Sequence, residues 1–486
     1  MSKHAELFIS AVDLRDLIRT RQTSSAEITA KVLDHIDETQ ATLNAFITVD
    51  RDNAMNAAEQ ADAAVARGDT VGPLHGVPVS VKDIINTAGL RTTWGSRLMA
   101  DNVPDADAVA VQRLKKAGAI IVGKTTTSEF AHKLLTDAPL FGTTRNPWDT
   151  RLTPGGSSGG SAVAVAAGMG PLSLATDAGA STRLPAALTG IVGLKPTLGV
   201  IPHNQVPDGF NNFIHLGVMA RTVADTALML DTVAGAHQAD PHSLGVAPPN
   251  AMSALNAGQG TAGLKIAWRA LIGTTLLDDK VRRACEKALD VFRGLGCTID
   301  VLDDPVENAE PAWRILQQAN WAARFYAKLN EVKDQLDPSF VEGIRVGGEY
   351  SGQQLLQATY KRTQHFRTVQ SWFAKYDLVL TPTCSRPPLP ADALALDPIR
   401  INGKDAGDMR QSWVPYLNLF DLTGHPAVSI PCGTTEAGLP VGLQIVGRWY
   451  EDARVLAAAA AFEKAQPWAH RIPPASFPPQ TRSPEK

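Results

Sequence analysis

The 486-residue chain contains little of what marks several special classes of protein. Its four cysteines, Cys285, Cys297, Cys384 and Cys432, form neither a C-x-x-C pair nor a Cys/His cluster, which argues against a disulfide scaffold and a metal site. No apolar run reaches the length that spans a bilayer, and the N-terminal stretch lacks the apolar segment of a secretory signal. These absences predict a cytoplasmic protein with reduced thiols, no bound metal and no membrane contact.

Neither sign of charge dominates. The 46 Lys and Arg residues against 49 Asp and Glu residues give a net charge of −3, and like charges do not gather in runs. We therefore expect no basic surface for nucleic acid or anionic lipid. The hydrophobic fraction of 44% is ample for a large core, and the charged fraction of 20% is ordinary for a globular protein.

What the sequence does contain is a stretch rich in glycine, serine and alanine, residues 153–197. It opens with GGSSGGS (155–161), where glycines let backbone N–H groups approach a ligand closely. The small apolar run SAVAVAAG that follows is typical of a buried helix, and the next turn, DAGASTR, presents Ser181. Serines on two such turns, joined by a buried helix, predict a catalytic site rather than a flexible linker.

This stretch resembles the signature region of the amidase signature family of serine hydrolases, and the similarity extends from about Leu14 to about Phe462. In that family a lysine, a serine held by a cis peptide and a nucleophilic serine form a triad. Matched residue by residue, these are Lys82 in PVSVKD, Ser157 in GGSSGGS and Ser181 in DAGASTR. Their separations of 75 and 24 residues are typical of the family.

The resemblance implies an α/β protein, an α/β/α layered sandwich around a large mixed β-sheet. It also implies a single domain over 1–486, with the signature core at about 70–230 and residues 264–465 completing the same sheet and pocket. Hydrophobic periodicity agrees with alternating helices and strands. We expect helices at 11–45 (two of them, the second capped by Ser24), 52–67, 107–117, 223–233, 279–294, 310–334, 353–374 and 451–464. Strands are expected at 79–82, 119–122, 264–268, 297–302 and 378–380 and around Val428 and Leu443, with 200–222 loop-rich and 238–262 a surface crossing.

Amide cleavage needs a nucleophile, a proton acceptor and donors for the developing oxyanion. The resemblance implies that Ser181 attacks, Lys82 is the base and Ser157 relays the proton. Lys82 can accept a proton only when neutral, a state that burial without a paired carboxylate favours. The candidate oxyanion donors are backbone N–H groups, those of Ala178, Gly179, Ala180 and Ser181.

The nucleophile turn departs from the family at one position. Relatives carry two glycines before the nucleophile, whereas this chain has Gly179 and Ala180. Alanine keeps its N–H group, but it would be strained if the turn required a positive φ there, and its methyl group could narrow the site. We expect Asp177 and Arg183 to brace the turn with an ion pair.

The substrate pocket is less well defined by the sequence. The segment before FGTTRNPW lines the pocket in relatives, so Phe130, Ala131 and His132 are candidates for its wall, and His132 has a structural role as its equal alternative. Phe210 and Phe213 are candidates for the acyl side of the pocket, with a place in the core as the default.

Two other motifs point to different chemistry. Residues 118–125 match the G-x-x-x-x-G-K-[ST] pattern of nucleotide-binding loops, but a helix should precede Gly118 and a β-branched strand should replace the phosphate loop. Residues 155–159 match the G-x-S-x-G elbow of other hydrolases, with Ser157 or the overlapping Ser158 at its centre, but no apolar strand precedes them.

The sequence therefore predicts an amidase that acts on a small-molecule amide without a cofactor. Two alternatives share the triad: a glutamine amidotransferase A-type subunit, which works within a complex, and an esterase or carbamate (urethane) hydrolase. The identity of the amide stays open, and so does assembly into a homodimer.

Overall fold

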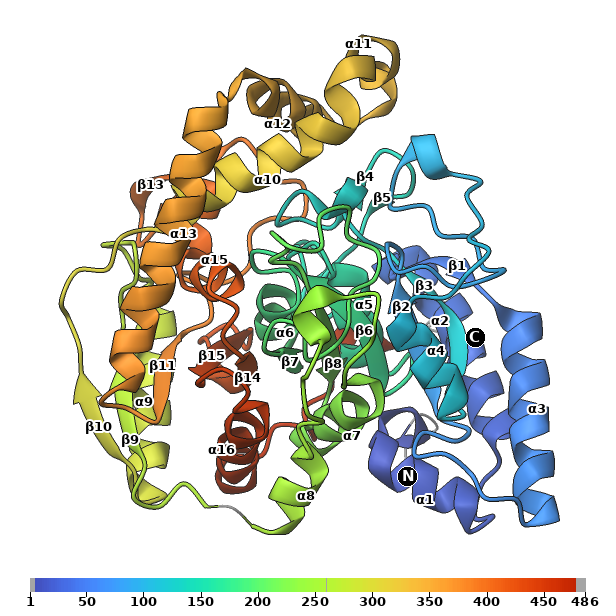
Figure 1. The fold of residues 1–486 in the computed structure, drawn as a ribbon. Coiled ribbons are helices and arrows are strands. Elements are labelled where there is room, and N and C mark those ends of the chain that lie inside the picture. The colour runs from blue at the N-terminus through green and yellow to red at the C-terminus, as the bar shows by residue number, and fades with distance from the viewer. Residues whose placement is uncertain (1–4, 259, 478–486) are drawn as a thin grey trace, which may run out of the picture.

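The structure is a computed structural model that describes residues 5–258 and 260–477 (Figure 1). Its centre is one mixed sheet of eleven strands. The prediction of an α/β fold around a large mixed sheet is confirmed. In spatial order the strands are β1 (Phe46–Val49), β3 (Ile120–Thr125), β2 (Pro78–Lys82), β6 (Leu172–Asp177), β8 (His215–Ala220), β7 (Val192–Lys195), β14 (Ala427–Thr434), β15 (Pro440–Val446), β11 (Leu378–Pro382), β9 (Lys265–Trp268) and β10 (Thr298–Val301).

The direction of the strands changes across the sheet. The middle of the sheet, from β6 to β11, is antiparallel, whereas β3, β2 and β6 run parallel on one side and β11, β9 and β10 on the other. Two small hairpins lie outside this sheet. One pairs β4 (Asp137–Ala138) with β5 (Gly142–Thr143), and the other pairs β12 (Pro398–Ile401) with β13 (Lys404–Asp408).

Helices surround the sheet and connect its strands. In the part of the chain that the structure describes, the α-helices are α1 (Ala11–Arg19), α2 (Ser25–Leu43), α3 (Arg51–Arg67), α4 (Val109–Lys116), α5 (Gly159–Ala166), α6 (Arg183–Thr189), α7 (Val223–Val233), α8 (Ala251–Asn256), α9 (Asp279–Gly294), α10 (Glu310–Phe325), α11 (Leu329–Val332), α12 (Pro338–Glu349), α13 (Gly352–Phe373), α14 (Met409–Trp413), α15 (Pro415–Leu422) and α16 (Asp452–Ala465). Helix α10 packs against both α12 and α13, and the three helices form the upper left part of the molecule in Figure 1.

Local sequence explains most of these elements. Ser24 caps α2 by accepting a hydrogen bond from the N–H of Glu27 at 3.0 Å, as its pattern predicts. Every residue of α5 is buried, as expected for a helix that is small and apolar on all sides. Helix α5 packs against β2 and β6 and also against α6.

The sequence-based prediction differs from the structure in several places. Residues 215–220 form the buried strand β8 within a segment expected to be loop-rich. The helix expected at 310–334 ends at Phe325 and continues as short 3₁₀ turns and α11, because residues 326–328 tighten into a 3₁₀ turn. Helix α12 was not predicted, and the crossing at 238–262 contains the short helix α8.

The sheet places the carboxyl ends of β2 and β6 side by side. Strands β2 and β6 are parallel neighbours, with Val79 opposite Leu172 and Val81 opposite Leu174. Their carboxyl ends therefore meet at the same edge, where loops in α/β proteins usually form binding sites. Lys82 ends β2 there, and Thr176 and Asp177 end β6.

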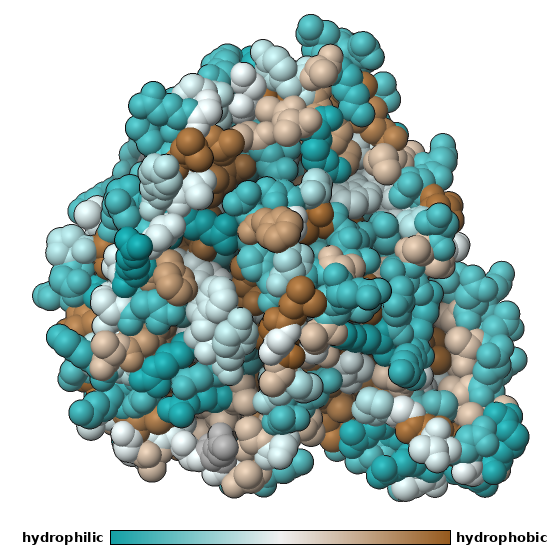
Figure 2. All heavy atoms as spheres, viewed as in Figure 1, coloured by the Kyte–Doolittle hydropathy of each residue, from teal (hydrophilic) through white to brown (hydrophobic). Residues whose placement is uncertain are grey.

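The surface is mainly polar. In Figure 2 hydrophilic residues cover most of the visible face, and apolar residues appear in small separate patches. Across residues 5–258 and 260–477 no helix is both long and apolar enough to cross a lipid bilayer.

Candidate active site

Lys82 lies at the end of β2 and is completely buried. Its Nζ donates hydrogen bonds to Ser157 Oγ at 2.7 Å and to Thr176 Oγ1 at 2.8 Å. Burial holds the pKa of Lys82 well below its usual value, and the charge of Asp177 offsets this only in part. The geometry therefore favours a neutral amine that can accept a proton.

The loop that carries Ser157 is shaped by its glycines. The Gly156–Ser157 peptide bond is cis, and Gly155 has a φ of +81°. A Cβ atom at position 156 would lie 2.6 Å from the carbonyl oxygen of Leu135. Any side chain at this position would therefore force the backbone at Leu135 to move. Thr136 Oγ1 pins the loop by donating to the carbonyl of Gly155 at 2.8 Å and accepting from the N–H of Gly159 at 3.0 Å.

Ser181 lies in the turn between β6 and α6 and is 9% exposed. The predicted ion pair beneath this turn is confirmed, because Arg183 Nε lies 2.8 Å from Asp177 Oδ2. Asp177 also accepts hydrogen bonds from the N–H groups of Ala180 and Thr182, at 2.7 and 3.1 Å. Although burial alone would raise it, the pKa of Asp177 is held below its usual range by Arg183, so this carboxylate stays ionised and fixes the turn.

The hydrogen bonds of this turn show which of the candidate N–H groups are free to bind an oxyanion. The N–H of Ala180 already donates to Asp177, which leaves that group unsuited to an oxyanion. For Ala178, Gly179 and Ser181, the structure shows no hydrogen bond from the backbone N–H to any described residue. These three groups therefore stay candidates.

Alanine fits at position 180 without strain. Its φ is not positive, and its side chain is buried in a hydrophobic cluster that includes Leu184. The backbone at Ala180 therefore does not have the strain that a positive φ would cause, and the methyl group of Ala180 packs into the core.

Two residues from distant segments enclose the turn. Trp313 Nε1 donates a hydrogen bond to the carbonyl of Ala178, and the guanidinium of Arg410 lies 3.6 Å above the Trp313 ring. A Cβ atom on Gly179 would lie 2.8 Å from both Trp313 Nε1 and Arg410 Nη2, so glycine is needed for this close approach. Glu310 holds Arg410 in place through a 2.9 Å contact with Nε.

Ser181 opens into a narrow cavity of about 70 Å³, called the site cavity below. Of the residues predicted for the pocket wall, Phe130 and Ala131 line this cavity. Loop 203–214 and helix α10 provide most of the remaining wall. The lining residues are Ile84, Trp94, Phe130, Ala131, Thr176, Ala178, Ser181, His203, Gln205, Val206, Pro207, Ile214, Gln317, Asn320, Trp321 and Arg324.

Three predicted pocket residues lie elsewhere. His132 bonds to the carbonyl of Glu129 and to Ser339 Oγ, both at 2.7 Å, and lines a different cavity together with Trp321. Phe210 is 82% exposed, because its loop turns it outward. Phe213 is buried in the core beneath the guanidinium of Arg362.

The nucleotide-loop and elbow motifs have structural roles. Ser158 is the residue just before α5, its Oγ donates a hydrogen bond to the carbonyl of Thr176 at 3.2 Å, and no strand directly precedes its loop. Residues 120–125 of the nucleotide-loop pattern form strand β3, and Lys124 is buried among Ile85, Thr87 and Thr92. Neither motif has the geometry that its usual function requires.

Thr176, Trp313 and Arg410 were missed by sequence reasoning. Thr176 could have been found from the parallel pairing of β2 and β6, since both strands end beside the serine loops. Trp313 and Arg410 carry no local signal, because they lie more than a hundred residues from the turn that they contact.

Comparison with known proteins agrees with this geometry. The family model named Amidase matches residues 27–456. An acylamidase from Rhodococcus erythropolis is 34% identical and aligns over 96% of this chain and 97% of its own length. The A-type subunit of a glutamyl-tRNA(Gln) amidotransferase from Azoarcus sp. (strain BH72) is 36% identical and aligns over 94% of this chain and 98% of its own length.

Solved structures show the same similarity. A bacterial aryl acylamidase of the amidase signature family superposes with a TM-score of 0.90 at 30% identity, covering 96% of this chain and 98% of that one. A 6-aminohexanoate cyclic dimer hydrolase superposes with a TM-score of 0.86 at 26% identity, covering 97% and 99%. The chain is thus a member of the amidase signature family, whose enzymes hydrolyse amides.

Proposed function

We propose that this protein hydrolyses a carboxylic amide through an acyl-enzyme on Ser181, with Lys82 as the base and Ser157 as the proton relay. The observation that carries the proposal is the 2.7 Å contact between a fully buried lysine amine and the Ser157 hydroxyl. A neutral amine in hydrogen-bond contact with a hydroxyl can begin a proton transfer. Ser181 stands at the cavity where an amide carbonyl would meet it.

The proposed reaction has two halves. In the first, Ser181 Oγ attacks the amide carbon while its proton passes through Ser157 to Lys82, and free N–H groups of the turn stabilise the oxyanion. Protonated Lys82 returns the proton through Ser157 to the leaving amine, so that the C–N bond breaks and an ester to Ser181 remains. In the second half, water gives a proton through Ser157 to Lys82 and attacks the ester. The C–O bond to Ser181 then breaks, Lys82 returns the proton through Ser157 to Ser181 Oγ, and the carboxylic acid is released.

Intact-mass spectrometry after quenching tests this sequence. The protein would be mixed with a slowly deacylated aryl ester and with a serine-directed fluorophosphonate, and the adduct mapped by peptide digestion. We expect both adducts on Ser181 and none in Ser181→Ala. An adduct on Ser157 or Ser158 that persists in Ser181→Ala would overturn the assignment.

The relatives named as amidotransferase subunits make glutamine a necessary comparison substrate. Release of ammonia from glutamine would be measured beside hydrolysis of aryl amides, aliphatic amides, esters and carbamates. Turnover of aryl or aliphatic amides by the isolated chain supports the proposal. Glutamine hydrolysis that requires added partner proteins, with no turnover of other amides, would favour the subunit role.

A further inference from the structure

We propose that Arg324 is a specificity residue that binds a carboxylate on the part of the substrate remote from the scissile bond. This inference rests on the proposed amidase function. It would give the enzyme a preference for amides that carry an acidic group over neutral amides of the same shape.

The first observation concerns charge. Among the described residues that line the site cavity, Arg324 is the one formally charged side chain, and no Asp or Glu lies in the lining. His203 does not add a second charge, since burial lowers its pKa to about 4. Arg324 is exposed to solvent and has no carboxylate partner in the cavity lining, so its guanidinium is available to pair with an anionic group of a ligand.

The second observation concerns what Arg324 contacts. Within residues 5–258 and 260–477 its side chain makes no hydrogen bond and no ion pair. Its guanidinium instead lies over aromatic rings, 5.4 Å from the centre of Trp94 and 5.8 Å from that of Phe130. Stacking on rings holds the plane of the guanidinium and leaves its edge N–H donors free for a carboxylate.

The third observation is a group of unsatisfied amides in the same lining. Gln205 Oε1 accepts a hydrogen bond from the N–H of Asn86 at 3.1 Å, whereas its Nε2 is buried without a partner. Gln317, which is 9% exposed, has its Oε1 buried without a partner. Buried polar atoms are nearly always paired, so these atoms point to polar groups of a ligand. Gln205 Nε2 is a second donor for the proposed carboxylate.

The position of Arg324 also suits a substrate that extends outward. Trp94, Phe130 and Arg324 line both the site cavity and an adjoining cavity of about 730 Å³. Trp94 and Phe130 have φ angles of +55° and +47°, and the N–H of Phe130 bonds to the carbonyl of Trp94 at 2.8 Å. Residues held in this strained region are typical of binding sites, and here they fix the two rings beneath Arg324.

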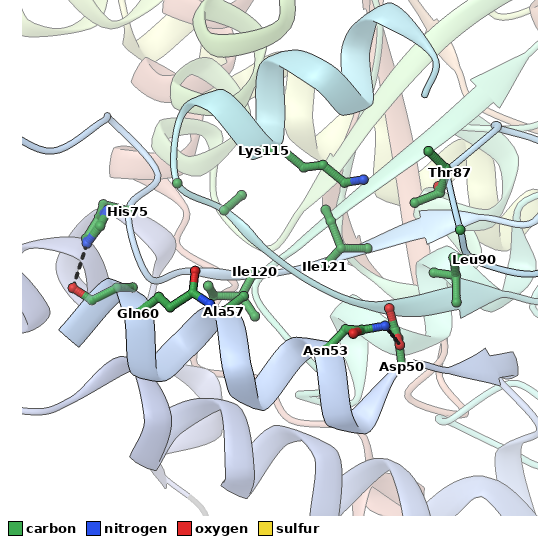
Figure 3. Close-up of a pocket in the computed structure, with 15 residues that line it drawn as sticks. Asp50, Asn53, Ala57, Gln60, His75, Thr87, Leu90, Lys115, Ile120 and Ile121 are labelled. Carbon is green, nitrogen blue, oxygen red and sulfur yellow. Dashed lines mark hydrogen bonds between the residues drawn. The ribbon is translucent and has the colours of Figure 1, made fainter. Parts of the chain in front are cut away.

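A cavity elsewhere in the molecule provides a contrast. The space of about 560 Å³ between α3 and α4 is also lined by a cation, Lys115 (Figure 3). There Lys115 pairs with Asp107 at 2.9 Å, Asn53 bonds to Asp50 at 2.8 Å, and His75 bonds to the carbonyl of Ala61 at 3.0 Å. Lys115 therefore has a carboxylate partner within the protein, whereas Arg324 has none among the described residues.

Matched anilides test the proposal. On the acyl side the pair is glutaranilate and 5-oxohexananilide, in which a methyl ketone replaces the carboxylate. On the amine side the pair is 4-acetamidobenzoate and 4-acetamidoacetophenone. We expect kcat/KM to favour the acid in at least one pair by about 10- to 100-fold, the range expected for hydrogen bonds to a charged group.

Variants assign the preference to Arg324. Arg324→Gln should reduce the preference to near one, by lowering kcat/KM for the acid much more than kcat/KM for the neutral anilide, and Arg324→Lys should keep part of the preference. Lys328→Gln is the matched control, because Lys328 lies one turn further along the chain and lines the outer cavity without lining the site cavity. In that control the preference should persist.

Calorimetry provides a measurement that does not depend on turnover. Glutarate should bind to Ser181→Ala, and about 10- to 100-fold more weakly to Ser181→Ala with Arg324→Gln. The proposal is overturned if neutral anilides are preferred in both pairs, or if Arg324→Gln leaves the acid preference and glutarate binding unchanged. If no amide at all is hydrolysed and Ser181 forms no adduct, the proposed function fails, and glutarate binding alone then decides the role of Arg324.

Discussion

Lys82 and Lys124 are two buried lysines on adjacent parallel strands, and their surroundings differ. In the pairing of β2 with β3, Val81 lies opposite Lys124, so the two lysines are one position apart. Lys82 contacts the hydroxyl groups of Ser157 and Thr176 beside the site cavity. Lys124 contacts the carbonyl of Ile85 and two threonine hydroxyls on a side away from the serines.

The charges around the two lysines differ as well. Burial lowers the pKa of Lys124 to about 7, and the carboxylate of Asp83 opposes that effect most strongly. Asp83 is buried too and accepts hydrogen bonds from the N–H and the hydroxyl of Thr93. Both lysines contact hydroxyl groups, but only Lys82 contacts the hydroxyl of a serine, Ser157, that could pass a proton toward Ser181. Burial alone does not make a lysine a base; its partners decide.

Replacing each lysine with methionine should separate the two roles most strongly. We expect Lys82→Met to lose turnover by about 10³-fold or more, since positioned proton transfer typically contributes ~10²–10⁴-fold, while its fold persists. Lys124→Met should keep activity within about tenfold of wild type, because Lys124 does not contact the serines. The measurement is kcat/KM on one aryl amide, with circular dichroism as the check of folding. Near-normal turnover in Lys82→Met would remove it as the base.

Ser157→Ala should have the next largest effect. It removes the hydroxyl between Lys82 and the nucleophile, so the rate should fall by ~10²–10⁴-fold while slow acylation at Ser181 remains. Intact mass after an ester pulse would show the adduct form slowly. If Ser157→Ala shows no adduct while Ser181→Ala does, the two serines have exchanged roles.

Lys124→Met should chiefly affect stability. The variant removes the buried hydrogen bonds of Lys124 to Ile85, Thr87 and Thr92 and the cation whose charge acts on Asp83, so we expect the free energy of unfolding to fall. Urea unfolding with a spectroscopic probe would measure the difference. An unchanged unfolding midpoint would show that Asp83 and Lys124 do not stabilise each other.

The same variant has a pH signature. The pKa of Lys124 is lowered to about 7 in the folded state and is near 10.5 in the unfolded chain. Between these values the unfolded chain binds the extra proton, so this residue makes stability rise with pH across that window. The rise from pH 7.5 to 9.5 should be smaller in Lys124→Met than in the wild type. Equal slopes would contradict the lowered pKa.

Thr176→Val should have the smallest effect. The hydroxyl of Thr176 accepts a hydrogen bond from Lys82 Nζ, and such a bond is stronger to the ammonium than to the neutral amine. Its loss should lower the pKa of Lys82 further, moving the acid limb of kcat/KM to lower pH with a rate loss within about tenfold. A shift to higher pH would show that Thr176 does not stabilise the protonated lysine.

The sequence by itself determined the local features of this protein. The Gly/Ser loop, the buried helix α5 and the Asp177–Arg183 pair lie within thirty residues of one another, so composition and spacing describe them well. Periodicity also predicted most of the longer helices and seven strands of the main sheet, but it missed β1, β6, β7 and β8. It missed β8 because that six-residue strand is stabilised by pairing with β6 and β7, which its own residues do not reveal.

Only the tertiary structure decided the surroundings of the serines. Trp313 and Arg410 contact the nucleophile turn from positions far along the chain, and Arg324 reaches the site cavity from the end of α10. In the folded protein Phe210 is exposed to solvent, Phe213 is buried and His132 lies beside another cavity. The physical reason is that a side chain's role depends on which distant surfaces pack against it, and local propensity does not encode those contacts. The lysine pair shows this directly, because the strand sequences make both lysines buried while the folded contacts give them different partners.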